Sequence, residues 1–278
     1  ISAITPMKTT LLITTYNRPD ALELCLMSVL RQTHLPDEIL IADDGSTADT
    51  KELIDTYRTK FSIPVIHIWH EDKGFRRTVI LNRAFLVAKG DYIIQVDGDL
   101  ILGRHFIADH INFAKEKCIA KGRRVCLSQK ETDRLLKEKS LKASIFLQGT
   151  TMREHGIRIP FYNQLFSPKE KATGDGVGGG NMAYWKADAL AINGYNMDIQ
   201  GWGPEDWEFA QRLVHLGCKQ RKLKFGAIQF HLEHNTYPKQ PTEAHLRMVE
   251  ELKKNKNIRC TNGVEQINNL IEQVKIYE

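Results

Sequence analysis

Apolar runs alternate with helical stretches through the first third of the chain, and this alternation restricts the fold more than any other feature. Runs rich in β-branched residues are predicted to be strands, and the amphipathic stretches between them to be helices. The predicted strands are 9–15, 38–42, 63–69 and 91–96, and the predicted helices are 20–32, 50–60 and 74–89. Because strands that alternate with helices are typical of a parallel sheet, we expect an α/β fold with a mostly parallel, Rossmann-like central sheet and helices on both faces.

Polar residues follow each of the four predicted strands. In sheets of this kind, ligands gather at the carboxyl ends of the strands. The residues at these ends are Thr14, Tyr16 and Arg18, then Asp43 and Asp44, then Asp72, Lys73 and Arg76, and finally Asp97 and Asp99. Taken singly they allow a plainer interpretation, since 43–46 is typical of a turn and Arg76 and Arg77 of a solvated helix face. Together, an aromatic ring, carboxylates and cations suit a nucleoside diphosphate.

The segment Asp97-Gly98-Asp99 follows the fourth predicted strand. Carboxylates at positions i and i+2 of an extended segment point the same way. They repel each other unless a cation or proton is shared between them, and a divalent ion that also contacts phosphate oxygens suits such a pair. The alternative is a simple turn, because Asp-Gly is common in turns.

Composition excludes several classes of protein. The 278 residues carry a formal net charge of +5, which is too weak to indicate nucleic acid but is compatible with an anionic substrate or a membrane surface. Five scattered cysteines fit a reducing compartment, and the sequence shows neither a signal peptide nor an apolar run of about 20 residues. We therefore expect a cytoplasmic protein, with peripheral contact to the inner face of a membrane left open. The glycine-rich loops of dinucleotide-binding enzymes and of P-loop NTPases are also missing.

The middle of the chain is less informative. The pattern predicts a helix over 102–121, with His105 and His110 as surface or packing residues because they do not share a face. A short strand is predicted at 125–128, followed by a solvated, Lys-rich helix or loop at 129–143. The stretch 146–172 shows no period and is assigned to a flexible loop near an acceptor site.

The second half contains a glycine-dense stretch, 174–180, that leads into a predicted strand at 182–185 and a short helix at 187–192. Glycines allow a backbone to approach a ligand closely. A helix is then predicted over 206–216. Glu205 and Asp206 at its start are either ordinary helix-start acids or, with Trp202 as a stacking platform, a general base beside a sugar-sized pocket.

A predicted strand at 224–230 ends at His231, with His234 shortly after it. A histidine at a strand end is either structural or a further metal ligand beside the Asp-x-Asp segment. From residue 242 the chain shows a helical pattern that includes Leu246, Val264, Leu270 and Ile271, and this tail is expected to pack on the domain.

Taken together, these motifs resemble the inverting, metal-dependent GT-A glycosyltransferases of family 2. The resemblance rests on 13–19, 42–46 and 96–99 in the first half. In the second half, 178–182 and 201–208 are similar to the galactosyltransferase-type C-terminal segment, which also occurs in chondroitin polymerases. The resemblance covers 8–102 and 174–234. It divides a GT-A domain into a nucleotide-sugar-binding half, 7–102, and an acceptor-binding and catalytic half, 103–241, with 242–278 as a helical tail.

The resemblance implies a UDP-sugar donor and Mn²⁺ or Mg²⁺. The implied nucleotide-binding residues are Thr14 and Tyr16 at the uracil, Asp44 at its ring N–H, Arg18, Arg76, and Asp97 at the ribose or near the metal. Asp99 would ligate the metal together with His231, ahead of His234. The family often has Ala-Arg-Asn after the third strand, whereas this chain has 80–83 as Ile-Leu-Asn-Arg, so an arginine there carries no assigned role.

On the acceptor side, the resemblance implies that Asp206 deprotonates the acceptor hydroxyl. Trp202, Glu205, Gly180 and Asn181 would bind the acceptor, a glycan or lipid-linked glycan used in surface polysaccharide synthesis. Two alternatives remain at this stage. A nucleotidyltransferase would normally have a glycine-rich phosphate loop after the first strand, which 16–19 is not. A non-catalytic module that binds a sugar or nucleotide is disfavoured because Asp97, Asp99, Asp206 and His231 occur together.

Overall fold

The computed structural model describes residues 7–166, 169–234, 242–267 and 274–277. The first half has the predicted alternation. Its elements are β1 (Thr9–Thr15), α1 (Pro19–Leu30), β2 (Glu38–Asp43), α2 (Ala48–Arg58), β3 (Val65–His70), α3 (Arg77–Val87) and β4 (Tyr92–Asp97). Each predicted element in this half is therefore confirmed, with boundaries shifted by a few residues.

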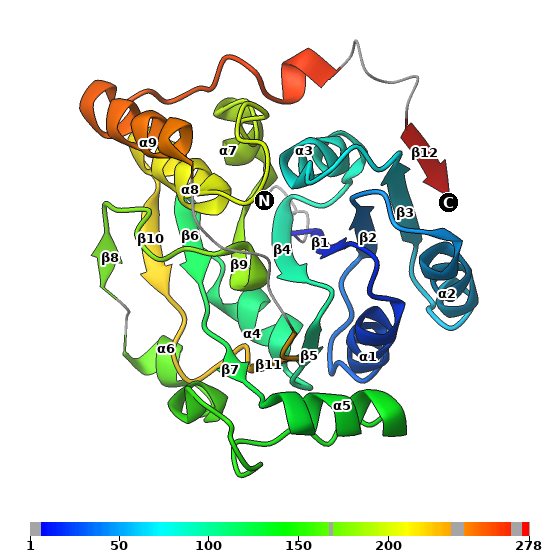
Figure 1. The fold of residues 1–278 in the computed structure, drawn as a ribbon. Coiled ribbons are helices and arrows are strands. Elements are labelled where there is room, and N and C mark those ends of the chain that lie inside the picture. Colours follow the sequence, from blue (N-terminus) through cyan, green and yellow to red (C-terminus); the bar gives the residue numbers. More distant parts are fainter. Residues whose placement is uncertain (1–6, 167–168, 235–241, 268–273, 278) are drawn as a thin grey trace, which may run out of the picture.

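The remaining elements are shorter and more varied. They are β5 (Leu100–Leu102), α4 (Phe106–Phe113), β6 (Cys118–Lys121), β7 (Val125–Cys126), α5 (Gln129–Glu138), η1 (Arg153–Gly156), α6 (Tyr162–Leu165), β8 (Glu170–Lys171), η2 (Gly179–Asn181), β9 (Met182–Trp185), α7 (Lys186–Ala191), α8 (Glu205–His215), β10 (Lys219–Lys222), β11 (Gln229–His231), α9 (Glu243–Asn255) and β12 (Val274–Tyr277). Figure 1 shows helices on both sides of the large sheet. Among the described residues, no helix is long and apolar enough to cross a membrane.

One large sheet joins the two halves of the chain. Its strand order is β12-β3-β2-β1-β4-β9-β6-β10-β8. Strands β1 to β4 pair in parallel, as predicted, and β9 then inserts antiparallel between β4 and β6. Because β10 is parallel to β6, the carboxyl ends of β1, β2, β4, β6 and β10 all lie at one edge of the sheet. A second, small sheet has the order β5-β11-β7.

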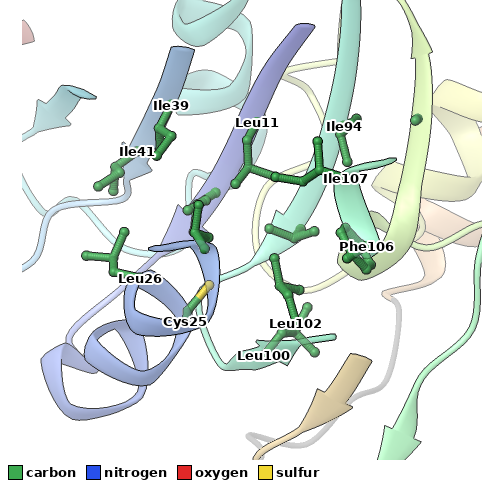
Figure 2. Close-up of a cluster of buried hydrophobic side chains, with 14 of the residues drawn as sticks. Leu11, Cys25, Leu26, Ile39, Ile41, Ile94, Leu100, Leu102, Phe106 and Ile107 are labelled. Carbon is green, nitrogen blue, oxygen red and sulfur yellow. The ribbon is translucent and has the colours of Figure 1, made fainter. Parts of the chain in front are cut away.

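The two faces of the large sheet bury separate apolar cores. Along β1, Leu11 and Ile13 point to one face and Leu12 to the other, as the alternation of a strand requires. The first core packs α1 and α4 on the sheet, with Cys25, Leu26 and Phe106 among its members (Figure 2). The second core packs α3, α7 and α8 on the opposite face. Helix α8, which begins at Glu205, is therefore fixed on the same side of the sheet as α3.

Three predictions for the second half are wrong in whole or in part: the helix over 102–121, the strand at 224–230 and the helical tail. The helix predicted over 102–121 is only α4, because its flanks pair as β5 and β6, and Lys117 turns with a φ of 55°. The strand predicted at 224–230 is replaced by β10 and β11. The chain between them turns through left-handed residues at Phe225 and Ala227.

Within its described residues, the tail is α-helical over α9, which ends at a left-handed residue, Lys256, and residues 264–267 have a 3₁₀ conformation. Val264 and Ile267 are buried, but the chain then returns to the sheet as β12, antiparallel to β3. Leu270 and Ile271 lie outside the described residues. The predicted Lys-rich segment forms α5, and the described residues of the stretch 146–172 form η1, α6 and β8.

A buried ion pair anchors α8. Arg212 is 1% exposed and contacts Glu208 at 2.7 Å, and its guanidinium also donates to the carbonyls of Ile192 (2.6 Å) and Gly194 (2.7 Å). These bonds tie α8 to the turn that follows α7. The orientation of the first turn of α8 depends on this anchor.

Arg212→Met is therefore expected to lower the free energy of unfolding by about 3–5 kcal/mol, because the Glu208 carboxylate stays buried without its partner. Urea unfolding measures this loss. The matched control is Arg247→Met, which breaks an i,i+4 pair with Glu243 whose side chains are 74% and 88% exposed, and should cost no more than about 1 kcal/mol. Equal losses in both variants would show that the Arg212 pair is not an anchor.

Candidate active site

A cavity of about 240 Å³ opens at the carboxyl ends of β1, β2 and β4. Its lining residues are Thr14, Thr15, Tyr16, Arg18, Ala42, Asp44, Phe75, Arg77, Ile80, Asp97, Gly98, Asp99 and His234. The structure thus brings together five of the six residues predicted to bind the nucleotide. The sixth, Arg76, does not line the cavity, whereas its neighbour Arg77 does.

The nucleotide-side residues are held by the ends of the strands. Thr14 and Asp97 are partners in the pairing of β1 with β4, and Thr14 Oγ1 donates to Asp97 Oδ1 at 2.9 Å. Asp44 is buried, with His70 Nε2 2.7 Å from its Oδ1 and the Arg76 amide donating to its Oδ2 at 2.9 Å. The Arg76 side chain donates to the Glu71 carbonyl at 2.6 Å. Its role at the nucleotide stays a prediction.

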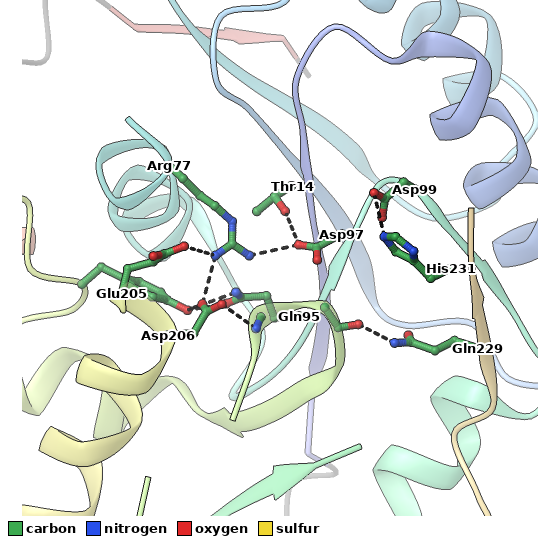
Figure 3. A network of polar contacts seen from close by, with 12 residues as sticks. Thr14, Arg77, Gln95, Asp97, Asp99, Glu205, Asp206, Gln229 and His231 are labelled. Carbon is green, nitrogen blue, oxygen red and sulfur yellow. Dashed lines mark hydrogen bonds and ion pairs between the residues drawn. The ribbon is translucent and has the colours of Figure 1, made fainter. Parts of the chain in front are cut away.

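Arg77 is the central cation of the site. Its guanidinium lies 3.0 Å from Asp97, 3.0 Å from Asp206 and 3.3 Å from Glu205 (Figure 3). The side chain is only 12% exposed, so its interpretation as part of a solvated helix face is wrong. Burial opposes the charge, but the three carboxylates raise the pKa of Arg77 well above its usual value.

One signal in the sequence could have identified Arg77. It is the first residue of α3, where the helix dipole disfavours a positive charge. An arginine at that position needs carboxylates from elsewhere in the fold. Within 80–83, both polar groups of the Asn82 amide bond the backbone of Tyr195 at 2.7–2.8 Å, which gives this asparagine a structural role.

Asp206 is held by three donors. Its oxygens accept from the Gly179 amide at 2.7 Å, from Arg77 Nη1 at 3.0 Å and from the Tyr195 hydroxyl at 3.2 Å. Gly179 is required for this approach, since a Cβ there would lie 2.3 Å from Arg77 Nη2. The glycine-dense stretch therefore serves to bring backbone amides against the acidic cluster.

Glu205 differs from its neighbour. Burial and the nearby charge of Asp206 raise the pKa of Glu205 to about 7, although Arg77 opposes the shift. Its Oε2 is buried and has no hydrogen-bond partner among the described residues. At neutral pH both the protonated and the ionised form of this carboxyl group are therefore populated, and it can donate as well as accept a proton.

A second cluster lies on the other side of Asp97. Asp99 Oδ2 is 3.3 Å from His231 Nε2 and 3.0 Å from His234 Nε2, and the three side chains offer ligand atoms within 4.8 Å of one another. The pairing of β5 with β11 places His231 opposite Leu100, one residue after Asp99. Asp97 faces Arg77 while Asp99 faces His231 (Figure 3). The two aspartates of the motif therefore serve different clusters.

The donor set fits one divalent cation. Asp99 Oδ1 is buried without a hydrogen-bond partner in the described part of the chain, so this oxygen is available to an ion. Although burial opposes ionisation, hydrogen bonds from His231 and His234 hold the pKa of Asp99 well below its usual range. One carboxylate with two imidazoles suits a transition ion such as Mn²⁺ better than Mg²⁺, which prefers oxygen ligands.

The residues predicted to bind the acceptor are dispersed. Trp202 is 41% exposed, and Gly180 lies so close to Asp97 that a Cβ would be 2.7 Å from its Oδ2. The Asn181 side chain is buried and donates to the carbonyl of Arg123 at 3.0 Å, while His110 Nε2 lies 3.0 Å from its Oδ1. His110 thus packs inside the fold, as expected. The acceptor roles themselves stay predictions.

Solved structures share this architecture. The S. aureus TarS fragment 1–349 in complex with UDP superimposes with a TM-score of 0.56 at 17% identity, covering 81% of this chain and 60% of that one. A mannosyltransferase from Pyrobaculum calidifontis, in complex with GDP-Man and Mn²⁺, gives a TM-score of 0.55 at 13% identity, covering 92% and 63%. The fold is therefore the GT-A fold of glycosyltransferases.

The chain belongs to glycosyl transferase family 2, whose model matches residues 10–175. A second model, described as the N-terminal domain of galactosyltransferase, matches residues 160–235. Among curated relatives, the hyaluronan synthase of Pasteurella multocida is 24% identical over 238 residues, and the chondroitin synthase of Escherichia coli is 24% identical over 251 residues. Each match covers 80% of this chain. The chain spans only 24% and 34% of the lengths of these two relatives.

The raised pKa of Glu205 predicts a pH-dependent stability. Because the folded pKa of about 7 exceeds the ordinary value of 4.5, the folded state binds the extra proton, and rising pH removes stability between these values. Glu205→Gln should therefore gain stability relative to the wild-type protein as pH rises from about 4.5 to 7, by up to about 3 kcal/mol.

Urea unfolding at several pH values measures this difference. The matched control is Glu243→Gln, which removes a carboxyl group that is 88% exposed. A difference for Glu205→Gln that is constant with pH would contradict the raised pKa.

Proposed function

We propose that the chain is an inverting, metal-dependent glycosyltransferase that moves a sugar from a UDP-sugar to a hydroxyl group of a glycan. The observation that carries this proposal is that Asp97 and Asp99 both line the cavity but contact different clusters of side chains. Asp99 lies in a metal-type cluster with two histidines, and Asp97 joins the Arg77 cluster that contains Asp206. The metal-type cluster reaches the cavity through Asp99, and the cluster that contains Asp206 reaches it through Asp97 and Arg77, an arrangement that suits a transfer reaction.

The nucleotide would occupy the cavity at the strand ends. Tyr16 is 47% exposed at its rim and offers a ring face to a base, and Asp44 lies below as an acceptor for a ring N–H. Arg18 supplies a cation to the same lining. The TarS fragment that shares this fold binds UDP, which supports the choice of a uridine nucleotide for this chain.

Asp99, His231 and His234 would hold the divalent ion beside the diphosphate. When bound, such an ion offsets the negative charge that develops on a departing nucleoside diphosphate. We favour Mn²⁺ because of the two imidazoles, and the mannosyltransferase complex contains Mn²⁺. With the ion on the leaving group, a single carboxylate is sufficient as the general base, and the paired carboxylates of a hydrolase are not needed.

Asp206 is the favoured base. Arg77 and the Gly179 amide orient its carboxylate, so that a remaining lone pair can accept the proton of an acceptor hydroxyl. Glu205, whose raised pKa leaves it partly protonated, would bind the acceptor by a hydrogen bond rather than compete as base. Trp202 would cover the sugar ring. Peripheral contact with a membrane stays a prediction.

The metal cluster predicts metal-dependent nucleotide binding. We expect titration calorimetry to show UDP binding with Mn²⁺ that weakens strongly in EDTA, and His231→Ala or His234→Ala to weaken the Mn²⁺-dependent part about tenfold or more, as loss of a ligand should. His105→Ala, which removes a histidine outside the cluster, serves as control and should leave binding unchanged. UDP binding that is independent of metal would contradict the proposal.

The base assignment predicts a separation of binding from catalysis. Asp206→Asn should retain UDP and Mn²⁺ binding but lower transfer by about 100-fold or more, since the general base is lost. A screen of UDP-sugars with glycan acceptors, read by UDP release and by the anomeric configuration of the product, measures this. Full turnover in the variant would remove Asp206 as base, and retention of configuration would exclude inversion.

A further inference from the structure

A group of cations extends the active edge of the sheet beyond the cavity. We call Lys121, Arg123, Lys171, Lys222 and Lys224 the basic surface. Lys121 ends β6 and Lys222 ends β10, and the two are partners in the pairing of these strands. The carboxyl ends of β6 and β10 point the same way as that of β4, which ends at Asp97. The basic surface therefore lies along the same edge as the candidate active site.

The strand register places three of these lysines on one face. Lys171 pairs with Gln220, and Lys222 follows Gln220 by two positions, so their side chains project to the same side. Lys121 shares that side as the partner of Lys222. Cys218 lies an even number of positions before Lys222, so its side chain projects to the same side, and it packs in the core that contains Phe209 of α8. This side is therefore the face of the sheet that α8 covers. The basic surface thus continues the face that carries Asp206.

The cations are close enough to influence one another. Burial, together with the charges of Arg123 and Lys222, lowers the pKa of Lys121 to about 8. Burial, Arg123 and Lys224 likewise lower the pKa of Lys222. The acids that face the group are Asp175 and Glu154, and within the described residues none of the five cations is paired with a carboxylate.

Five cations without carboxylate partners among the described residues are gathered in one place on this surface. Several other lysines and arginines on the surface do have acidic partners, such as Lys115 with Glu170 and Arg158 with Asp109. Concentrating like charges without partners costs stability. An external anion would remove that cost.

Two series of hydrogen bonds connect the basic surface with Asp206, the proposed general base. Asp206 accepts from the amide of Gly179, and two residues later Asn181 donates to the Arg123 carbonyl at 3.0 Å. On the other route, Trp207 Nε1 donates to Asp175 Oδ1 at 3.0 Å, and the Asp175 carbonyl accepts from Lys121 Nζ at 2.7 Å. Both routes begin beside Asp206 and end at the basic surface.

We propose that the basic surface binds anionic groups, carboxylates or phosphates, of the glycan acceptor and guides its reactive end toward Asp206. The proposal rests on the proposed glycosyltransferase function and adds the chemical class of the acceptor. An extended anionic chain fits the linear arrangement of the cations along the sheet edge. Exposed aromatic rings next to them, including Phe161 and Phe166, offer faces for sugar rings.

A lipid surface fits less well. Lys121 is only 7% exposed and its amine bonds the loop at Asp175, so a flat bilayer would not reach it. Binding to anionic lipid vesicles is accordingly an outcome that would overturn the proposal.

The test uses a double charge reversal, Lys171→Glu with Lys222→Glu. The control, Lys130→Glu with Lys254→Glu, changes the net charge equally at exposed positions on α5 and α9. Three probes are compared at low salt: an unsulfated glycosaminoglycan oligosaccharide with one carboxylate per disaccharide, its carboxyl-reduced neutral counterpart, and a glycerol phosphate oligomer. Binding of UDP with Mn²⁺ is measured on the same samples.

We expect the wild-type protein and the control to bind at least one charged probe, and the double reversal to weaken that binding about tenfold or more while UDP binding is unchanged. Stronger binding of the carboxylate probe or of the phosphate probe identifies the anionic group. Equal loss in the control, equal affinity for the neutral probe, or preference for phosphatidylglycerol vesicles would overturn the proposal. If the wild-type protein binds the charged probe but not UDP, the proposed function fails instead.

Discussion

The site depends on one interaction, the contact of Arg77 with three carboxylates. Asp97 comes from the end of β4 in the first half of the chain, whereas Glu205 and Asp206 come from the start of α8 in the second half. Without a cation between them, these acids would repel one another at short range. Arg77 thus joins the two halves electrostatically at the point where the proposed reaction takes place. Burial, together with the charge of Asp206, raises the pKa of Glu205 although Arg77 lies beside it.

The antiparallel strand β9 makes this contact possible. It enters the sheet between β4 and β6 and is preceded by Gly179 and Gly180, which have no room for a Cβ. The backbone therefore approaches Asp97, Arg77 and Asp206 directly. On the other side, the small sheet of β5, β11 and β7 carries His231 to Asp99. The large sheet therefore places Asp97, and the small sheet places the histidine that contacts Asp99.

This arrangement separates two kinds of charge along one edge of the large sheet. The cavity and its acidic clusters lie at the ends of β1, β2 and β4, and the basic surface lies at the ends of β6 and β10. In the proposed function, a cation-bound donor and an anionic acceptor would approach from different directions along this edge. The family relationship supports the donor side, while the acceptor side rests on the charges of this chain.

The sequence by itself determined the α/β class, the parallel direction of the first four strands and the residues at their ends. The reason is that the alternation of strands with helices and the chemistry of strand ends are local properties. It also indicated Asp97, Asp99, Asp206 and His231 as polar residues at element ends. Only the tertiary structure decided that Arg77 is central, that His234 joins His231 at Asp99, and that Asp97 and Asp99 belong to different clusters. These outcomes depend on contacts between residues more than a hundred positions apart, such as Arg77 with Asp206. The mistaken helix over 102–121 and the mistaken tail have the same cause, since pairing with distant strands overrode a local helical pattern.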